Sequence, residues 1–358
     1  MDTLLVYGSY GYTGDLIVRE ALARGGAPVL AGRDPDRLRE QADAHGLEHR
    51  AFAIEDDATL GGELEPFDAV VNCAGPFVDT ADSLVSACLE AGTDYLDITG
   101  EYEVFARLAA TDERARDAGV TLLPGVGFEV VPSDCLAGFL AGELPTASDL
   151  TLAISGRPSF SRGTARTLLR YLGDGGLIRR DGQLYRVPRA HDTREVDFGD
   201  GRGPTRVVTA PWGDIVTAPY STGIGNVTGF ADVPNPAIWA MRANDTLSLE
   251  RVLGSRPLRA ALERLVDVGV GDPSPAERER DRVTIWGEVT DGERTVSARL
   301  ETPDPYTLTA ESAVVAAERL LDGGVDAGFQ TPVTAFGHEV VTECSGVEGP
   351  LLETREVA

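Results

Sequence analysis

The hydrophobic pattern of the first third of the chain alternates between short apolar runs and amphipathic stretches. Apolar runs that suit buried parallel strands lie at residues 4–7, 28–31, 50–54, 67–72, 94–98 and 120–124. Stretches with helical spacing separate several of them, at about 12–23, 35–45, 80–91 and 102–118. Six strands with crossover helices predict a doubly wound parallel sheet of the α/β class, whose ligand lies beyond the carboxyl ends of the strands.

The pattern changes at about residue 128. Strand-like segments then follow one another at 149–155, 184–187, 205–209, 226–231, 282–290 and 295–301, with helices expected at 162–172 and 257–267. This succession is typical of an α+β domain built on a mainly antiparallel sheet.

The chain of 358 residues is long for a single core, so two domains are expected. We predict a dinucleotide-binding domain over 1–127, an inserted substrate domain over 128–305, and a C-terminal segment over 306–358. Residues 271–281 carry two prolines and many charges, which indicates a solvated loop. A helix at 309–322 is expected to pack back on the first domain.

Charge narrows the possible partners. The chain has 58 acidic and 32 basic residues, a formal net charge of −26, and all its basic residues other than histidine are arginine. Acids spread over the whole chain favour a protein of a salt-accumulating halophile, because salt screens their mutual repulsion. They disfavour nucleic acid and anionic membrane surfaces as partners.

Absent residue types exclude several chemistries. Without lysine there is no Schiff base, no Walker A lysine and no Tyr-x-x-x-Lys catalytic pair. The four cysteines lack C-x-x-C spacing and the four histidines form no ligand cluster, so we expect no metal site and no disulfide. No apolar run approaches the ~20 residues that span a bilayer, and the start of the chain does not resemble a signal peptide, so a cytoplasmic protein is expected.

The turn after the first strand carries the most specific motif. Gly8, Gly11 and Gly14 have G-x-x-G-x-x-G spacing and lead into the first helix. Such glycines allow a tight turn, close approach of a pyrophosphate, and close packing of helix on strand. The predicted phosphate-binding turn comprises Gly8, Ser9, Tyr10, Gly11, Tyr12, Thr13 and Gly14. The alternative is a glycine turn that only closes a βα unit.

The end of the second strand indicates which nucleotide is bound. Arg33 stands about 20 residues after Gly14, where an NAD site usually has an acid for the ribose 2′-hydroxyl. A guanidinium there would pair with the 2′-phosphate of NADP, so NADP(H) is favoured over NAD(H). Asp34 keeps NAD open as an alternative.

The ends of the later strands supply candidates for the rest of the site. Residues expected near the nicotinamide or the adenosine are Asp56, Asn72, Cys73, Ala74, Gly75 and Pro76. Asn72 could equally form the turn, and Asp56 could be a solvated turn acid. Proton donors are sought among Tyr95, Glu101, Asp134, Tyr220 and His338, although Ser133 or Asp134 could instead cap the following helix.

Across these motifs the chain resembles the saccharopine dehydrogenase-like family. The resemblance rests on Tyr-Gly-Ser-Tyr-Gly-Tyr-Thr-Gly at the start, Ala-Gly-Arg, Asn-Cys-Ala-Gly-Pro-Phe, Tyr-Leu-Asp-Ile-Thr-Gly-Glu and Gly-Phe-Glu-Val-Val-Pro-Ser-Asp. Residues 161–165, 211–214 and 328–332 are similar to the branch of trans-acting enoyl reductases. The resemblance implies a Rossmann domain, an inserted α+β domain and NADP-linked oxidoreduction. Glu129 stands where many relatives have aspartate.

These observations lead to one preferred function and two alternatives. The preferred function is an NADPH-dependent reductase of an activated C=C (enoyl) or C=N bond in a small or lipid-like substrate. One alternative is a non-catalytic NADP-binding regulatory or scaffold protein. The other is an enzyme for another carbonyl or amino-acid substrate, with Arg162 and Arg166 binding its carboxylate. A homodimer through the second sheet is possible.

Overall fold

The computed structural model describes residues 4–54, 57–156, 161–165, 175–188, 190–234 and 271–356, together with 238, 264, 266 and 269. The chain divides into two compact units. Unit 1 comprises Met1–Cys135 and Pro305–Gly346, and unit 2 comprises Leu136–Asp304 and Val347–Ala358. The C-terminal segment that begins at Pro305 is therefore divided between the units, because residues up to Gly346 belong to unit 1 and those from Val347 belong to unit 2.

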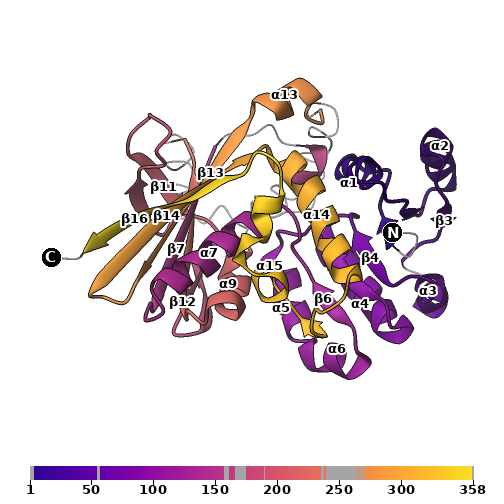
Figure 1. The fold of residues 1–358 in the computed structure, drawn as a ribbon, viewed down its shortest axis with the longest axis horizontal. Helices are drawn as coiled ribbons and strands as arrows, with labels where there is room; N and C mark the ends of the chain where they lie inside the picture. The colour runs from indigo at the N-terminus through magenta and orange to yellow at the C-terminus, as the bar shows by residue number, and fades with distance from the viewer. Residues whose placement is uncertain are drawn as a thin grey trace. The chain divides into compact units, whose positions relative to one another are not determined.

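Unit 1 contains a sheet of seven parallel strands (Figure 1). Their order is β15 (Gly328–Phe329), β6 (Thr121–Leu123), β5 (Asp94–Asp97), β4 (Ala69–Asn72), β1 (Leu4–Tyr7), β2 (Val29–Gly32) and β3 (His49–Ala51). Strand β1 lies between β2 and β4, so the strand order reverses at its carboxyl end. The predicted doubly wound sheet is confirmed, and this reversal is the point at which such sheets bind ligands.

The helices of unit 1 include those that the pattern predicts, and several that it does not. They are α1 (Tyr12–Ala23), α2 (Pro35–His45), α3 (Asp57–Leu64), α4 (Phe77–Ala91), α5 (Tyr102–Ala109), α6 (Asp112–Ala118), α7 (Val131–Glu143, which continues into unit 2), α14 (Pro305–Leu321), α15 (Pro332–Phe336) and the 3₁₀ helix η2 (His338–Glu343). The predicted helix over 102–118 is two helices, and Thr111 at the break donates its hydroxyl to the Arg107 carbonyl at 3.0 Å. Helix α3 was not predicted.

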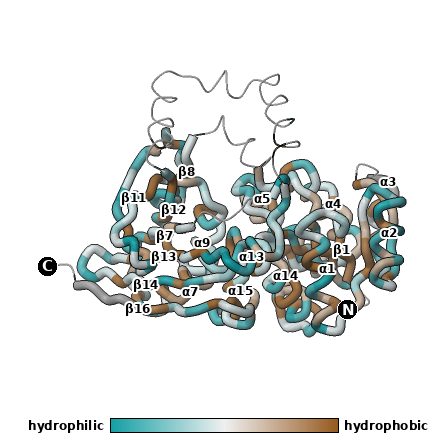
Figure 2. Tube along the Cα trace, turned by 90° about the horizontal axis from the view of Figure 1, so that it is seen from above, coloured by the Kyte–Doolittle hydropathy of each residue, from teal (hydrophilic) through white to brown (hydrophobic). Residues whose placement is uncertain are grey.

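Two hydrophobic cores cover the two faces of this sheet. Alternate residues of the strands point to opposite faces, so Leu5 and Tyr95 join one core while Leu4 and Leu96 join the other. The second core is closed by α14, whose apolar stretches are visible in Figure 2. Helix α14 packs on α1, and the predicted return of this helix to the first domain is seen within unit 1.

Unit 2 is built on a mixed, mostly antiparallel sheet. The strand order is β10 (Thr193–Val196), β11 (Thr205–Thr209), β12 (Asn226–Asp232), β7 (Asp149–Ser155), β13 (Arg282–Thr290), β14 (Arg294–Pro303) and β16 (Glu348–Glu356). Strand β8 (Gly176–Arg180) pairs with β12 and with β9 (Gln183–Val187). Only the β12–β7 pair is parallel among these described strands.

The helices of unit 2 correct one expectation. The segment 271–281, predicted as a loop, contains the helix α13 (Pro275–Arg280), because Ser274 and Glu277 form a capping box. A second helix, α9 (Asp214–Thr222), was not predicted. Residues 162–165 are helical as expected, while the rest of the helix expected at 162–172 and most of that at 257–267 lie outside the described residues.

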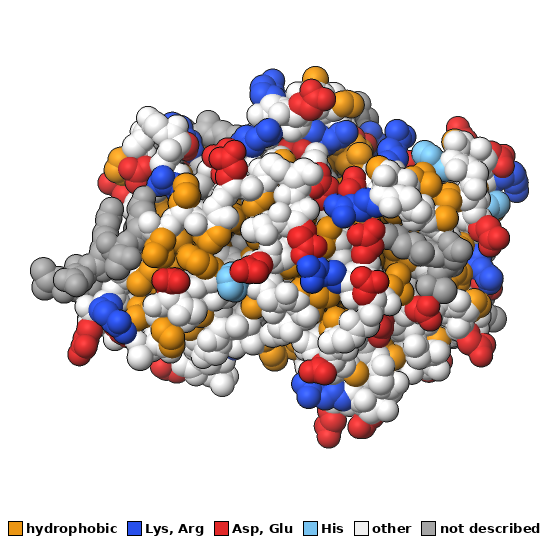
Figure 3. Space-filling view, viewed as in Figure 1, with side chains coloured by type: hydrophobic (Ala, Val, Ile, Leu, Met, Phe, Trp, Pro, Cys, Tyr) orange, Lys and Arg blue, Asp and Glu red, His pale blue; other side chains and the backbone are white. Residues whose placement is uncertain are grey.

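On the face shown in Figure 3 the acidic side chains are spread out, with arginines between them. Several form surface ion pairs one helical turn apart, such as Arg19 with Asp15 and Arg24 with Glu20, both at 2.7 Å. Within the ranges that the structure describes, no helix has the length and apolarity needed to cross a membrane.

The turn between β1 and α1 is closely packed. Gly8 has φ +80°, a left-handed conformation that favours glycine. A Cβ on Gly14 would lie 2.4 Å from the Gly8 carbonyl oxygen, closer than non-bonded atoms approach. Glycine at position 14 therefore lets α1 begin directly against the strand end.

We predict that Gly14→Ala lowers the free energy of unfolding by about 1–3 kcal/mol, because the added methyl group must push α1 away from the turn. Chemical denaturation of the two proteins measures the difference. The control is Gly142→Ala in α7, where a Cβ meets no atom within 4 Å, and it is expected to raise stability by up to about 1 kcal/mol. Equal stability of Gly14→Ala and the wild type would contradict the packing argument.

Candidate functional site

The glycine turn presents backbone N–H groups at the start of α1. Gly11 caps the helix in an extended conformation and offers no side chain to the first turn. The first N–H groups of any α-helix have no acceptor within the helix, and their dipoles attract anions. A Cβ on Gly8 would lie 2.9 Å from the Ala74 backbone nitrogen, so the turn also lies directly against the chain that follows β4. The turn therefore has the form of a phosphate site.

The side chains of the turn hold it to its neighbours. The buried Ser9 hydroxyl donates to Gln41 Oε1 at 2.8 Å, and Gln41 Nε2 donates to the Ser9 carbonyl at 2.9 Å. Gln41 Nε2 also donates to Asp15 Oδ1 at 3.1 Å. Ser9 therefore fixes the turn to α2 through its side chain. The Tyr12 ring meets Tyr306 edge-on, with 5.2 Å between their centroids, and ties the start of α1 to α14.

Two arginines lie at the tip of β2. Arg33 is exposed, and among the described residues it forms no hydrogen bond or ion pair. The Arg37 guanidinium stacks over the Tyr10 ring at 4.4 Å and donates to the Tyr10 carbonyl at 2.9 Å. Arg37, in the first turn of α2 and four residues after Arg33, was not singled out from the sequence. The tip thus offers one uncommitted cation and a second held beside the glycine turn.

Asp34, the residue that left NAD as an alternative cofactor, caps the N-terminus of α2. Its Oδ1 accepts the backbone N–H groups of Asp36 and Arg37 at 3.1 and 3.2 Å, so it is the N-cap of α2. Its own N–H donates to the Tyr10 hydroxyl at 3.2 Å. The Asp34 carboxylate is therefore engaged in capping α2.

The loop after β4 is closed by hydrogen bonds of its own. The buried Asn72 accepts the Ala74 N–H at 3.0 Å and donates to Thr80 at 3.1 Å and to Tyr95 at 3.2 Å. The Cys73 N–H donates to the Tyr7 carbonyl at 2.8 Å, which sets this loop beside the glycine turn. Asn72 thus acts as the turn former that its residue type allows. Burial raises the pKa of the half-buried Cys73 thiol. Gly75 and Pro76, which follow in the same loop, are exposed.

A buried pair at the end of β5 joins this loop to the next ones. The Tyr95 hydroxyl donates to Asp97 Oδ2 at 2.9 Å, and Asp97 Oδ1 accepts the N–H groups of Thr99 at 3.0 Å and Gly125 at 2.9 Å. Burial raises the pKa of Asp97 to about 6, while the donated N–H groups act to lower it. Burial also raises the pKa of Tyr95 well above its ordinary value.

Two further predicted acids accept backbone N–H groups at helix starts. Glu101 is buried and accepts the N–H groups of Phe77 at 3.0 Å and Val78 at 2.9 Å, at the start of α4. The buried Asp134 accepts the N–H of Val333 at 2.9 Å, at the start of α15. Each satisfies donors that a helix leaves open, in the manner of an N-cap.

The remaining predicted residues belong to other elements or lie outside the described residues. His338 is exposed at the start of η2, and Tyr220 is half-exposed on α9 of unit 2. Asp56 and Arg166 lie outside the described residues. A catalytic role for Tyr95, Glu101, Asp134 and His338 stays a prediction, and the first three would each have to act while bonded as described.

One carboxyl that the sequence did not single out for catalysis differs from the others. Glu129 follows β6, is half-buried, and makes no hydrogen bond or ion pair with the residues that the structure describes. Its side chain lies on Gly100, where a Cβ would be 2.6 Å from Glu129 Cγ and 2.9 Å from Oε2. Burial raises the pKa of Glu129 to about 7. The sequence signal was an acid in the loop between β6 and α7, which did not distinguish Glu129 from the other acids that follow strands of this sheet.

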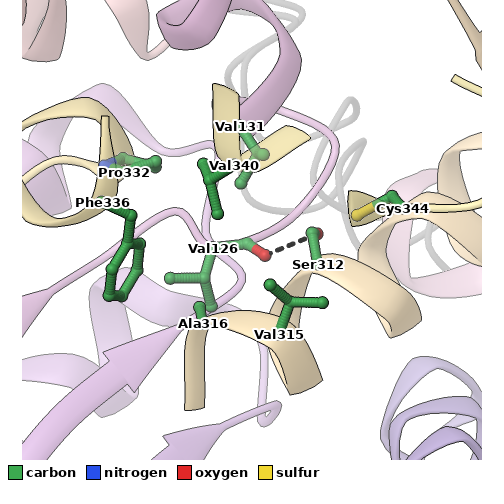
Figure 4. Close-up of a pocket in the computed structure, with 9 residues that line it drawn as sticks. All are labelled: Val126, Val131, Ser312, Val315, Ala316, Pro332, Phe336, Val340 and Cys344. Carbon is green, nitrogen blue, oxygen red and sulfur yellow. Dashed lines mark hydrogen bonds between the residues drawn. The ribbon is translucent and has the colours of Figure 1, made fainter. Parts of the chain in front are cut away.

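A small apolar cavity lies on the α14 side of unit 1 (Figure 4). Its lining includes Val126, Phe336 and Val340, and the Ser312 hydroxyl donates to the Val126 carbonyl at 2.8 Å. Its volume of about 10 Å³ leaves room for about one water molecule, so it is a packing defect too small for a substrate. The four cysteines are free, and in the parts of the chain that the structure describes no three His, Cys, Asp or Glu side chains are grouped for a metal.

Comparison with known proteins finds a family whose sequence model matches the N-terminal part of the chain. Residues 4–123 match the family model of the saccharopine dehydrogenase NADP binding domain. A Mycobacterium tuberculosis protein named as a trans-acting enoyl reductase is 34% identical over 187 residues, which are 47% of this chain and 44% of that protein. The saccharopine dehydrogenase-like oxidoreductase of Mus musculus is 26% identical over 203 residues, 49% of this chain and 47% of that protein. The chain thus matches less than half the length of these relatives.

A solved structure extends the likeness in fold to the whole chain. Saccharopine dehydrogenase (L-Glu forming) from Saccharomyces cerevisiae aligns over 100% of both chains with a TM-score of 0.67 and 13% identity. The predicted architecture, a Rossmann sheet with a second and mainly antiparallel sheet, is confirmed by this likeness. Residues 4–123 are thus similar to saccharopine dehydrogenase NADP binding domains, and about half of the chain is similar to part of the saccharopine dehydrogenase-like oxidoreductases.

Proposed function

We propose that the protein is an NADPH-dependent reductase that acts on an activated C=C or C=N bond of a small or lipid-like substrate. The arrangement at the tip of β2 carries this proposal, because Arg33 is exposed and uncommitted while Asp34 caps α2. The enoyl reductase name of the mycobacterial relative supports the C=C bond as one of the two substrate classes.

The residues present suit the cofactor. The open N–H groups at the start of α1 would hold the pyrophosphate, with Gly8, Gly11 and Gly14 giving the backbone room to approach it. Arg33 would pair with the 2′-phosphate, and Arg37 would add a second positive charge from its stacked position on Tyr10. The exposed backbone of Gly75 and Pro76 would border the nicotinamide.

When bound, the nicotinamide supplies the hydride of the reduction. The task of the protein is then to orient the substrate, exclude water and deliver one proton. The loops after β4, β5 and β6 form the edge at which this would happen, because Asp97 and Glu101 join them through backbone N–H groups. A rigid edge of this kind favours a single orientation of the reacting groups.

A second candidate function is a non-catalytic NADP-binding regulatory or scaffold protein. It is favoured by one observation: Tyr95, Glu101 and Asp134, the predicted proton donors at this edge, are all engaged in buried hydrogen bonds. A protein that only binds the nucleotide needs no group at this edge that can give up a proton. Turnover distinguishes the two functions.

We predict that Arg33→Ala weakens NADPH binding about 10- to 150-fold and leaves NADH binding unchanged, because a charge-assisted hydrogen bond contributes about 1.5–3 kcal/mol. Calorimetric titration of both nucleotides measures the effect. Arg39→Ala removes an equal charge from the exposed pair with Asp36 on α2 and is the matched control. Equal loss in both variants would indicate a general charge effect and would contradict a phosphate contact at Arg33.

Oxidation of NADPH with enoyl thioesters and with imines, followed at 340 nm, tests the reductase itself. We expect turnover with one of the two classes and none with saturated thioesters. Absence of turnover with both, in a protein that binds NADPH tightly, would overturn the reductase and favour the regulatory function.

We also propose that the protein works at high salt. The reason is the net charge of −26, whose self-repulsion is screened within about 3 Å at 1 M salt. The melting temperature is expected to rise between 0.1 M and 3 M KCl. An unchanged or falling melting temperature over this range would contradict the proposal.

A further inference from the structure

The loops at the carboxyl edge of the unit 1 sheet contain several acids, and almost all of them are committed. Asp97 accepts two backbone N–H groups and one hydroxyl, and Glu101 and Asp134 accept backbone N–H groups at helix starts. Each of these bonds stabilises the ionised form of its carboxyl. At Asp97 these bonds oppose the effect of burial, which still raises its pKa to about 6, and all three carboxyls are occupied by the groups that they bond.

Glu129 is placed in the same loops but is held differently. The Phe128 N–H donates to Thr309 Oγ1 at 3.0 Å and the Val126 N–H donates to the Asp97 carbonyl at 2.8 Å, which fix the chain on its N-terminal side. Two residues later the Val131 N–H donates to the Gly127 carbonyl at 2.9 Å. The backbone of Glu129 is thus fixed from both sides, while its carboxyl bonds to none of the described residues.

Gly100 determines where the carboxyl of Glu129 can lie. The absence of a side chain at position 100 lets Glu129 Cγ and Oε2 rest on the backbone between β5 and α5. Gly100 directly precedes Glu101, whose carboxylate accepts the N–H groups at the start of α4. The carboxyl of Glu129 is therefore within the group of loops that lies at the ligand-binding edge of a doubly wound sheet.

We propose that Glu129 is the proton donor of the reaction, and the proposal rests on the proposed reductase function. The O–H bond of the protonated carboxyl breaks and its electron pair remains on the carboxylate. The proton forms a bond to the carbon or nitrogen that receives the electron pair of the reduced double bond. NADPH is the reductant that the balance requires, and solvent returns the proton to Glu129 before the next turnover.

The acid–base properties of Glu129 agree with this role. Burial raises its pKa to about 7, and no charged side chain contributes to the shift. The acids on the neighbouring elements, Asp97, Glu101 and Asp134, have their charges met by the N–H groups described above. A donor whose pKa lies near the working pH is present in both forms, which suits proton transfer in each turnover.

The first test measures Glu129 without any reaction. We expect ¹³C NMR of the glutamate-labelled, cofactor-free protein to show one carboxyl that titrates near pH 7 and that is missing from Glu129→Gln. Because the ionised form is disfavoured in the folded state, Glu129→Gln is also expected to melt above the wild type at pH 8, with a difference that shrinks as the pH falls below 7 and is lost below the ordinary pKa near 4.5. Titration of Glu129 at its ordinary pH near 4.5 would overturn the proposal.

The second test measures turnover with NADPH and an enoyl thioester or imine. We expect Glu129→Gln to lower kcat at least 100-fold with unchanged NADPH affinity, and to remove the fall in wild-type kcat above pH 7. Glu129→Asp, which keeps the acid, should recover part of the rate. Gly100→Ala, which displaces the carboxyl without removing it, should also lower kcat. Glu90→Gln, an exposed glutamate on α4, is the control.

The outcomes separate this assignment from the proposed function. A wild type that turns over and a Glu129→Gln variant that turns over equally would overturn the assignment of Glu129 and leave the reductase intact. A wild type that turns over neither substrate class would overturn the reductase, and the assigned step with it, whatever the titration shows.

Discussion

The architecture of the site depends on buried carboxylates that accept backbone N–H groups. Asp97 joins the end of β5 to the loop after β6 through Gly125, and Glu101 joins the loop after β5 to the start of α4. Without these acceptors, N–H groups of turns and helix starts would be buried and unsatisfied, which costs about 1–3 kcal/mol for each group. The three loops are therefore one connected edge, and whatever binds there meets a preorganised surface.

The same constraint explains why acids at strand ends are ambiguous in a sequence. Asp97, Glu101 and Asp134 all stand where catalytic acids of doubly wound proteins stand, yet each also stands where a carboxylate can satisfy N–H groups. Spacing cannot separate the two, because the acceptor or donor comes from a distant part of the chain. The N–H of Val333, for example, lies 199 residues from Asp134.

Local signals made other parts of the fold predictable. Helix α2 begins and ends as expected because Asp34 caps it, Pro35 starts it, and Gly46 ends it with φ +70°. The strands β15 and β16 escaped prediction for the opposite reason. β15 has two residues and pairs with β6, and β16 pairs with β14, so long-range pairing defines them. Of the two arginines that follow β2, the sequence indicated Arg33, because it directly follows the strand. It did not indicate Arg37, because the position of Arg37 depends on stacking over the Tyr10 ring.

Glu129 differs from the other acids of these loops in its hydrogen bonding, and it differs from Asp97 in the influences on its pKa. A carboxyl that accepts N–H groups stabilises the loops, and the donated N–H groups act to lower its pKa, as at Asp97, where burial outweighs them and the pKa is about 6. Glu129 is raised by burial without such opposition, so its carboxyl costs folding stability when ionised. Asp97, Glu101 and Asp134 accept hydrogen bonds, whereas the Glu129 carboxyl accepts none from the described residues. A buried acid that lowers folding stability in this way is typical of groups retained for chemistry, which agrees with the proposed role of Glu129 as proton donor.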